Sequence, residues 1–269
     1  MTASAADGTP DTATSFVIAI DGPAGTGKST IARRVAIALG AGYLDTGAMY
    51  RLVSLAVLDA GIDPTDARCV AELLPRLTFD TPTDPGGQRH VLAGKDVSNE
   101  IRGQGVTLAV TPVSANPAVR AWLLGRQREL AYSGRMVVEG RDIGTVVTPD
   151  APLKIYLTAD AIERARRRHR QNTVRAGVPA GGSGESRDTA VVSEGAGGRA
   201  DGSTDDNGAA ATDLAAVALD LHRRDSHDST RQHAPLQAAQ DAVVIDSSEL
   251  AVHETVDRVL TLAAERGIR

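Results

Sequence analysis

Aromatic residues and cysteine are both scarce in this chain of 269 residues. Phe, Trp and Tyr together make up 3% of the sequence, so the core must be built from the aliphatic side chains of Val, Leu, Ile and Ala. The single cysteine, Cys69, excludes an internal disulfide. We expect Cys69 to pack in the structure rather than to act in catalysis.

Long apolar runs are absent as well. No run approaches the ~18 residues of a membrane-spanning helix, and the start of the chain lacks the basic and apolar segments of a secretory signal. We therefore predict a cytoplasmic protein with no membrane partner. The net charge of −5 argues against a general nucleic-acid binder, so we expect no nucleic-acid partner either.

The strongest positive feature is a glycine-rich loop that follows a short apolar run. Phe16 to Ile20 predicts a buried strand, and residues 22–29 fit the pattern G-x-x-x-x-G-K-S/T of a phosphate-binding loop. In this pattern the backbone N–H groups surround a polyphosphate, Lys28 reaches the β- and γ-phosphates, and the Ser29 hydroxyl binds Mg²⁺. A helix predicted from Ser29 to Leu39 would point its N-terminal dipole at the anion.

A glycine-rich turn that binds nothing is the alternative interpretation of this loop. The position of the loop between a buried strand and an amphipathic helix disfavours that alternative. The predicted ATP-binding residues are Gly22, Pro23, Ala24, Gly25, Thr26, Gly27, Lys28, Ser29 and Thr30.

Strands and helices alternate along the rest of the chain, which indicates an α/β fold. Further strands are predicted at Tyr43–Leu44, Arg135–Glu139, Leu153–Leu157 and Ala242–Asp246. Further helices are predicted over Asp66–Leu74, Asn116–Tyr132, Leu214–Leu221 and Val252–Ala264. Two more helices are predicted to start at Asp160 and just after Thr46, with Thr46 as the N-cap. Leu77–Asp80 and Arg89–Leu92 predict an antiparallel hairpin in a small accessory lobe, with Gly94 to Asp96 as a turn.

Two segments differ in composition from the rest. Residues 1–15 are small and polar, and we predict a disordered tail there. Residues 176–211 hold nine of the 27 glycines and almost no large apolar side chains, so we predict a flexible insertion. Residues 16–269 then form a single domain around this insertion.

Several charged residues follow the predicted strands or lie on predicted helices. Arg141 and Asp142 lie between two glycines just after a strand, where open α/β sheets bind ligands, although a solvated loop would have the same pattern. Arg164 and Arg168 share one face of a helix, which is also compatible with a solvated basic surface. Tyr50 and Arg51, taken singly, are compatible with an ordinary helix surface.

Together these segments resemble the bacterial cytidylate (CMP) kinases, a branch of the nucleoside monophosphate kinases with a P-loop. The matching segments are Ile20-Asp-Gly-Pro-Ala-Gly-Thr-Gly-Lys28, Leu44-Asp-Thr-Gly-Ala-Met-Tyr-Arg51, Val97-Ser-Asn-Glu-Ile-Arg102, Glu139-Gly-Arg-Asp-Ile-Gly-Thr145, Pro149-Asp-Ala-Pro-Leu-Lys-Ile155 and the residues Arg224, Asp228, Arg231 and Ala234 to Leu236. The similarity runs from about Phe16 to Ile268 and leaves out the tail and the glycine-rich insertion.

The resemblance implies a P-loop kinase fold with a parallel five-stranded sheet flanked by helices. It also implies a monophosphate-binding lobe with a small antiparallel sheet over about residues 46–115, and a lid region over about residues 160–225. The implied reaction is Mg²⁺-dependent transfer of the ATP γ-phosphoryl group to CMP or dCMP. We expect a monomer whose partners are these nucleotides.

The resemblance also assigns roles to individual residues. The implied CMP-binding residues are Thr46, Tyr50, Arg51, Thr111, Arg120, Arg141, Asp142, Arg224, Asp228 and Arg231. Among them Arg51 and Arg141 hold the acceptor phosphate, Thr111, Arg120 and Asp142 surround the cytosine, and Arg224 and Asp228 reach the ribose. The implied catalytic residues are Lys28, Arg141, Arg164 and Arg168.

The chain departs from the family at three places. Thr111 replaces a common Ser but keeps the hydroxyl, and His227 replaces a common Arg near the ribose. The glycine-rich insertion is longer than usual beside the lid.

Two other functions remain open at this point. Another P-loop kinase, for a nucleoside or a small acid, would share the loop but would have less need for so many arginines. A GTPase-type switch is disfavoured because the sequence contains no N-K-x-D guanine motif.

Overall fold

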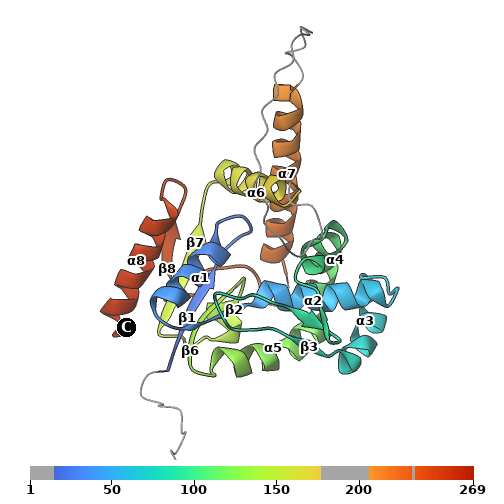
Figure 1. Cartoon of the computed structure of the whole chain (residues 1–269), viewed down its shortest axis with the longest axis horizontal. Helices are drawn as coiled ribbons and strands as arrows, with labels where there is room; N and C mark the ends of the chain where they lie inside the picture. The colour runs from blue at the N-terminus through green and yellow to red at the C-terminus, as the bar shows by residue number, and fades with distance from the viewer. Residues whose placement is uncertain (1–14, 177–205, 232–233) are drawn as a thin grey trace, which may run out of the picture.

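The computed structural model describes residues 15–176, 206–231 and 234–269 (Figure 1). The predicted tail, apart from Ser15, lies outside the described residues, and so do residues 177–205 of the predicted insertion. None of the helices in the described part of the chain is long and apolar enough to cross a membrane.

A five-stranded parallel sheet forms the centre of the molecule, with the strand order β2-β6-β1-β7-β8. Its strands are β1 (Phe16–Asp21), β2 (Gly42–Asp45), β6 (Arg135–Gly140), β7 (Leu153–Thr158) and β8 (Val243–Asp246). The predicted five-stranded parallel sheet is confirmed. Strand β1 is apolar at nearly every position because helices cover both faces of the sheet.

Alternate side chains of β1 enter two different cores. Ile18 and Ile20 pack with α1 (Lys28–Ala38) and α8 (Val252–Glu265) on one face of the sheet. Val17 and Ala19 pack on the other face, against helices α2 (Thr46–Asp59), α4 (Gln104–Ala115) and α5 (Pro117–Ala131). Full burial of each large aliphatic side chain stabilises the fold by roughly 1.5–3 kcal/mol.

The accessory lobe contains a three-stranded antiparallel sheet in the order β3-β4-β5. Its strands are β3 (Phe79–Asp80), β4 (Val91–Leu92) and β5 (Lys95–Asp96), preceded by α3 (Ala67–Leu73) and the 3₁₀ turn η2 (Leu74–Arg76). The predicted hairpin is confirmed, but the turn predicted at Gly94 to Asp96 was too long. Lys95 and Asp96 pair with β4, and the chain reverses at Ala93 and Gly94, both of which have positive φ angles.

Helix α4 has no counterpart among the predicted helices. It follows the short 3₁₀ turn η3 (Glu100–Arg102) and starts after Gly103. It also contains Pro112, which has no backbone N–H to donate, and a proline inside a segment weakens the sequence signal for a helix. Its buried residues Val106, Ala109, Val110 and Val113 nevertheless follow helical spacing and pack the helix mainly against α2.

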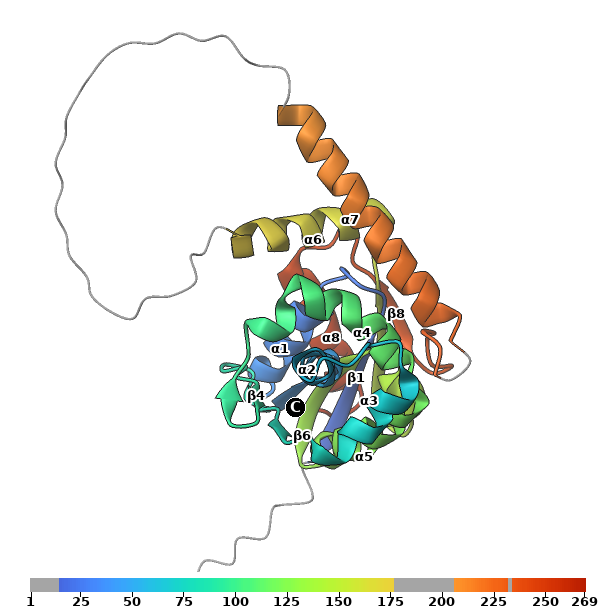
Figure 2. The same ribbon diagram turned by 90° about the vertical axis from the view of Figure 1, so that its right-hand side faces the viewer.

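Two helices of the predicted lid region, α6 (Ala161–Ala176) and α7 (Asp206–Ser229), pack against each other above the sheet (Figure 2). The backbone is helical from Asp206 onward, so α7 begins inside the range that the sequence assigned to the insertion. The last turns of α7 return toward the carboxyl ends of the sheet strands (Figure 1).

Candidate active site

The glycine-rich loop between β1 and α1 has a conformation that requires glycine. Gly22 has a φ of +147°, and a Cβ atom added there would lie 2.0 Å from the carbonyl oxygen of Leu157. Gly25 has a φ of +81°, and its Cβ would lie 2.9 Å from the carbonyl oxygen of Arg164. The loop is therefore packed tightly against its neighbours, and glycine is the residue that tolerates both constraints.

Lys28 is the first residue of α1 and is buried, with 6% of its surface exposed. Its Nζ donates a hydrogen bond of 2.6 Å to the carbonyl oxygen of Pro23, which folds the side chain back along the loop. Burial, together with the positive charge of Arg141, lowers the pKa of Lys28, while the carboxylate of Glu139 opposes this change. A bound polyphosphate would favour the charged form of this lysine.

A cavity of ≈ 180 Å³ opens beside this loop. From the loop and the start of α1 it is lined by Ala24, Gly25, Gly27, Lys28, Ser29 and Thr30. Four of the predicted arginines also line it, namely Arg51, Arg141, Arg168 and Arg224. We call this space the donor cavity. The remaining predicted ATP-binding residues, Gly22, Pro23 and Thr26, lie in the loop but do not line the cavity.

A second cavity of ≈ 90 Å³ lies next to the first. All the residues predicted to bind CMP line it: Thr46, Tyr50, Arg51, Thr111, Arg120, Arg141, Asp142, Arg224, Asp228 and Arg231. We call this space the acceptor cavity. Arg51, Arg141 and Arg224 line both cavities, so three guanidinium groups lie where the two spaces meet.

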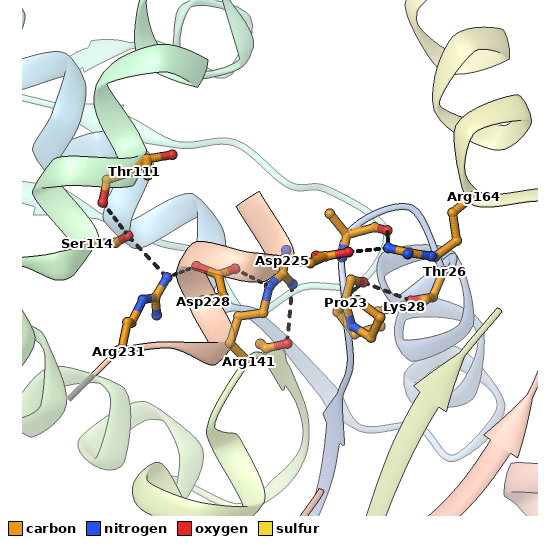
Figure 3. A network of polar contacts seen from close by, with 12 residues as sticks. Pro23, Thr26, Lys28, Thr111, Ser114, Arg141, Arg164, Asp225, Asp228 and Arg231 are labelled. Carbon is orange, nitrogen blue, oxygen red and sulfur yellow. Dashed lines mark hydrogen bonds and ion pairs between the residues drawn. The ribbon is translucent and has the colours of Figure 1, made fainter. Parts of the chain in front are cut away.

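Ion pairs join the elements around the acceptor cavity (Figure 3). Arg141, just after β6, donates from Nε to Oδ2 of Asp228 on α7 at 3.0 Å, and Arg231 pairs with the other oxygen of Asp228. Arg120 of α5 pairs with Asp142 and lies 5.7 Å from the centre of the Tyr50 ring. Both carboxylates are therefore compensated by arginines within the cavity wall.

Arg51 is held by its own lobe. Its Nη1 donates to the carbonyl oxygen of Ile101 at 3.0 Å and to Oγ1 of Thr107 at 3.1 Å. Burial, and next the positive charge of Arg224, lowers the pKa of Arg51. An anion placed between these two arginines would relieve their mutual repulsion.

Thr46 has a different local role from the one predicted. Asp45, not Thr46, is the N-cap of α2, because its carboxylate accepts a hydrogen bond of 2.9 Å from the N–H of Ala48. Thr46 is the first helical residue, and its hydroxyl donates to the carbonyl oxygen of Glu139 at 2.7 Å. This contact holds the start of α2 against the end of β6.

Asp21, at the end of β1, positions the loop that carries Arg141 and Asp142. Its buried carboxylate accepts hydrogen bonds from the N–H groups of Ile143 at 2.8 Å and Gly144 at 2.7 Å. These residues start the π-helical turn η4 (Ile143–Val147). Burial raises the pKa of Asp21 to about 6, although both backbone donors oppose the rise. Nothing in the sequence pattern distinguished Asp21 from an ordinary strand end.

The donor cavity offers oxygen atoms suited to Mg²⁺. Ser29, the predicted ligand, lines the cavity together with the carboxylates of Asp45 and Glu139, which the sequence did not single out. Tyr43 donates to Glu139, and burial raises the pKa of that carboxyl group. In the described part of the chain no cluster of His, Cys, Asp or Glu could hold a metal by itself. Magnesium commonly binds through a few protein oxygens and the substrate phosphates, so this set fits it.

The two predicted lid arginines occupy different positions. Arg168 lines the donor cavity, as a phosphate-binding residue would. Arg164 does not line it; its Nη1 donates to the carbonyl oxygen of Ala24 at 3.1 Å and pairs with Asp225 of α7. Asp225 was not among the predicted site residues.

Comparison with known proteins agrees with this geometry. The family model described as cytidylate kinase matches residues 18–178 and 189–265, which include every residue that lines either cavity. A protein of Mycolicibacterium paratuberculosis named cytidylate kinase is 49% identical over 251 residues, covering 93% of this chain and 96% of that protein.

Two further relatives carry the same name. The protein of Rhodococcus opacus is 46% identical over 253 residues, covering 94% of this chain and 96% of the relative. The protein of Geobacillus kaustophilus is 41% identical over 249 residues, covering 93% of this chain and 96% of the relative. The resemblance seen in the motifs is confirmed: this chain belongs to the cytidylate kinase family, whose members are nucleoside monophosphate kinases.

Proposed function

We propose that this chain transfers the γ-phosphoryl group of ATP to CMP, giving ADP and CDP. The observation that carries the proposal is the junction of the two cavities. The P-loop lines one cavity, all the expected CMP-binding residues line the other, and Arg51, Arg141 and Arg224 line both. Phosphoryl transfer requires two anionic substrates in line and a positive environment where their phosphates meet.

On the donor side, the loop around Gly25 and the N-terminus of α1 would hold the ATP phosphates through backbone N–H groups. Lys28 would leave the carbonyl oxygen of Pro23 for the β- and γ-phosphates, and Arg168 would approach from α6. Ser29, with Asp45 and Glu139 nearby, would hold the magnesium ion. When bound, Mg²⁺ neutralises negative charge on the β- and γ-phosphates.

On the acceptor side, Arg51 and Arg141 would bind the CMP phosphate. A guanidinium group binds two phosphate oxygens at once, and it stays charged at neutral pH even when burial lowers its pKa. Arg224 and Asp228 would contact the ribose from α7, and Tyr50 would pack against the base. No general base is needed, since the second pKa of a phosphate monoester is about 6 and the attacking oxygen is already ionised at neutral pH.

Asp142 and Arg120 would recognise the cytosine ring. An ionised carboxylate only accepts hydrogen bonds, so Asp142 suits the 4-amino group of cytosine and repels the 4-carbonyl oxygen of uracil. Arg120 only donates, so it suits the N3 and O2 atoms of cytosine. The two side chains already pair with each other in the cavity wall. This pairing supports their action as one recognition unit.

The proposal extends to dCMP as a second acceptor, to a cytoplasmic location and to a monomer. The direct test is an assay of ADP release with CMP, dCMP, UMP, AMP, GMP and cytidine. We expect rapid turnover with CMP, somewhat slower turnover with dCMP and little with the others. Faster turnover with cytidine than with CMP would favour the alternative, a P-loop nucleoside kinase.

A further inference from the structure

The P-loop residue Ala24 contacts the lid helices α6 and α7 through its N–H, its carbonyl oxygen and its side chain. Its N–H donates to Oδ1 of Asp225 at 3.0 Å, and its carbonyl oxygen accepts from Nη1 of Arg164 at 3.1 Å. Its buried side chain packs with Ala165 of α6 and Leu221 of α7. Both polar atoms of one P-loop residue are thus bound by an ion pair from outside the loop.

This ion pair is shielded from solvent. The side chains of Arg164 and Asp225 are 14% and 15% exposed, and neither residue lines the donor or the acceptor cavity. Figure 3 shows the two side chains meeting beside the loop, on the side of Pro23 and Thr26. Each charge at such a site depends on the other, because neither is well solvated.

The position of Asp225 on α7 is informative. Arg224 precedes it and Asp228 lies three residues later, and both of these line the acceptor cavity. Within this one segment of α7, Arg224 and Asp228 therefore face the acceptor cavity, and Asp225 faces the P-loop. Figure 3 shows Asp228 directed at Arg141 while Asp225 is directed at Arg164.

We propose that Asp225 and Arg164 are positioning residues for the donor-phosphate loop. They fix the orientation of Ala24 by binding its N–H and its carbonyl oxygen, so that the following N–H groups of the loop stay directed at the donor phosphates. Preorganised backbone donors bind an anion more tightly than donors that must first be ordered. This inference rests on the proposed function to the extent that the loop binds ATP.

Variants that change the charge at positions 164 and 225 distinguish this positioning role from direct binding of phosphate by Arg164. Replacement of Arg164 by Ala leaves the Asp225 carboxylate unpaired next to the loop, where it repels the donor phosphates and favours a displaced loop. Removal of Asp225 as well eliminates the repulsion. If Arg164 instead contacted phosphate, the uncharged pair Arg164→Gln/Asp225→Asn would still lose the guanidinium group and would bind ADP about as weakly as Arg164→Ala.

The test measures equilibrium binding of Mg-ADP and, separately, of CMP by titration calorimetry. We expect Arg164→Ala to weaken ADP binding about 10- to 100-fold and the double variant Arg164→Ala/Asp225→Ala to regain about tenfold of that loss. Binding of CMP alone should change by less than about twofold in both variants. The control Arg166→Ala, an exposed arginine of α6, should leave both affinities unchanged.

A second double variant serves as a control in case the alanine variants fold poorly. Arg164→Gln/Asp225→Asn keeps side chains that can bind both polar atoms of Ala24 without charge, so we expect ADP affinity within about threefold of the original. A loss as large as in Arg164→Ala would overturn the proposal. So would a double alanine variant as weak as the single one, or an equal loss of ADP and CMP affinity. Because ADP binding needs no acceptor, a failure of CMP phosphorylation would count against the proposed function alone.

Discussion

Arg141 and Asp228 form an ion pair that joins the end of β6 to α7, with 3.0 Å between Nε and Oδ2. Arg231 binds the other oxygen of the same carboxylate. A single carboxyl group therefore keeps two arginines apart and oriented at the edge of the acceptor cavity. This arrangement gives Asp228 two roles, since it also lies where we expect the ribose.

Replacement of Asp228 by Ala should lower kcat/KM for CMP about 10- to 100-fold, because a hydrogen bond from a charged group to the ribose is lost and the arginines lose their common partner. The loss should be smaller for dCMP, which lacks one ribose hydroxyl. The measurement is kcat/KM for both acceptors, with the exposed neighbour Ser229→Ala as the control. An unchanged ratio of CMP to dCMP would show that Asp228 does not contact the ribose.

Replacement of Asp142 by Ala should strongly reduce activity with CMP and also reduce the preference for CMP over UMP. We expect a preference of roughly 100-fold or more in the unaltered chain, because UMP would leave polar groups of both Asp142 and Arg120 unsatisfied. Steady-state assays with CMP and UMP on both proteins provide the comparison. If the variant kept the full preference, base recognition would have to come from another part of the cavity.

Replacement of Lys28 by Ala should lower kcat about 100- to 1000-fold, because a preorganised positive charge is lost from the donor cavity. The fold should persist, since the side chain hydrogen-bonds to the carbonyl oxygen of Pro23 within its own loop. Circular dichroism and ADP-release assays test both statements, with the exposed Lys95→Ala as the control. Turnover within tenfold of the original in a folded variant would contradict the role of the P-loop.

The raised pKa of Asp21 gives a pH dependence of stability with a definite sign. Folding raises this pKa from 3.8 to about 6, so folding disfavours the ionised form. The contribution of Asp21 to the free energy of unfolding is largest below pH 3.8 and is lost as the pH rises through about 6. The total decrease in this free energy is up to about 3 kcal/mol. The free energy of unfolding, relative to that of Asp21→Asn, should therefore fall between about pH 4 and about pH 7.

Urea unfolding of both proteins at several pH values measures this difference. Asp246 provides a matched control, because it ends a parallel strand as Asp21 does but is exposed, and hydrogen bonds from Ser248 lower its pKa. Relative to Asp246→Asn, the stability should rise with pH only below about pH 4 and stay level between pH 4 and pH 7. Equal slopes for the two comparisons would contradict the pKa assigned to Asp21.

Local sequence patterns predicted the central sheet and most of its helices. Strand β1 and the loop after it were recognisable because a buried parallel strand is apolar throughout and the loop requires glycine at fixed positions. The acceptor residues required the family resemblance, because Tyr50, Arg120 and Arg231 come from segments that meet only in the folded chain.

The features missed from the sequence depend on tertiary contacts. Strand β5 is two residues long and is defined only by its pairing with β4. Asp21 and Asp225 act through backbone N–H groups of distant segments, at Ile143 and Ala24. A carboxylate that binds backbone donors of a distant segment has no local sequence signature, so these two residues could be identified only from the structure.

The order of the strands in the sheet has a consequence for synthesis on the ribosome. Strand β1 is made first, but its two neighbours are β6, which begins at Arg135, and β7, which begins at Leu153. A nascent chain that ends before Arg135 therefore carries an apolar strand with both edges unpaired, the kind of segment that aggregates or recruits chaperones. Because these pairings are distant in sequence, the sheet must assemble late and slowly, after most of the polypeptide has left the exit tunnel.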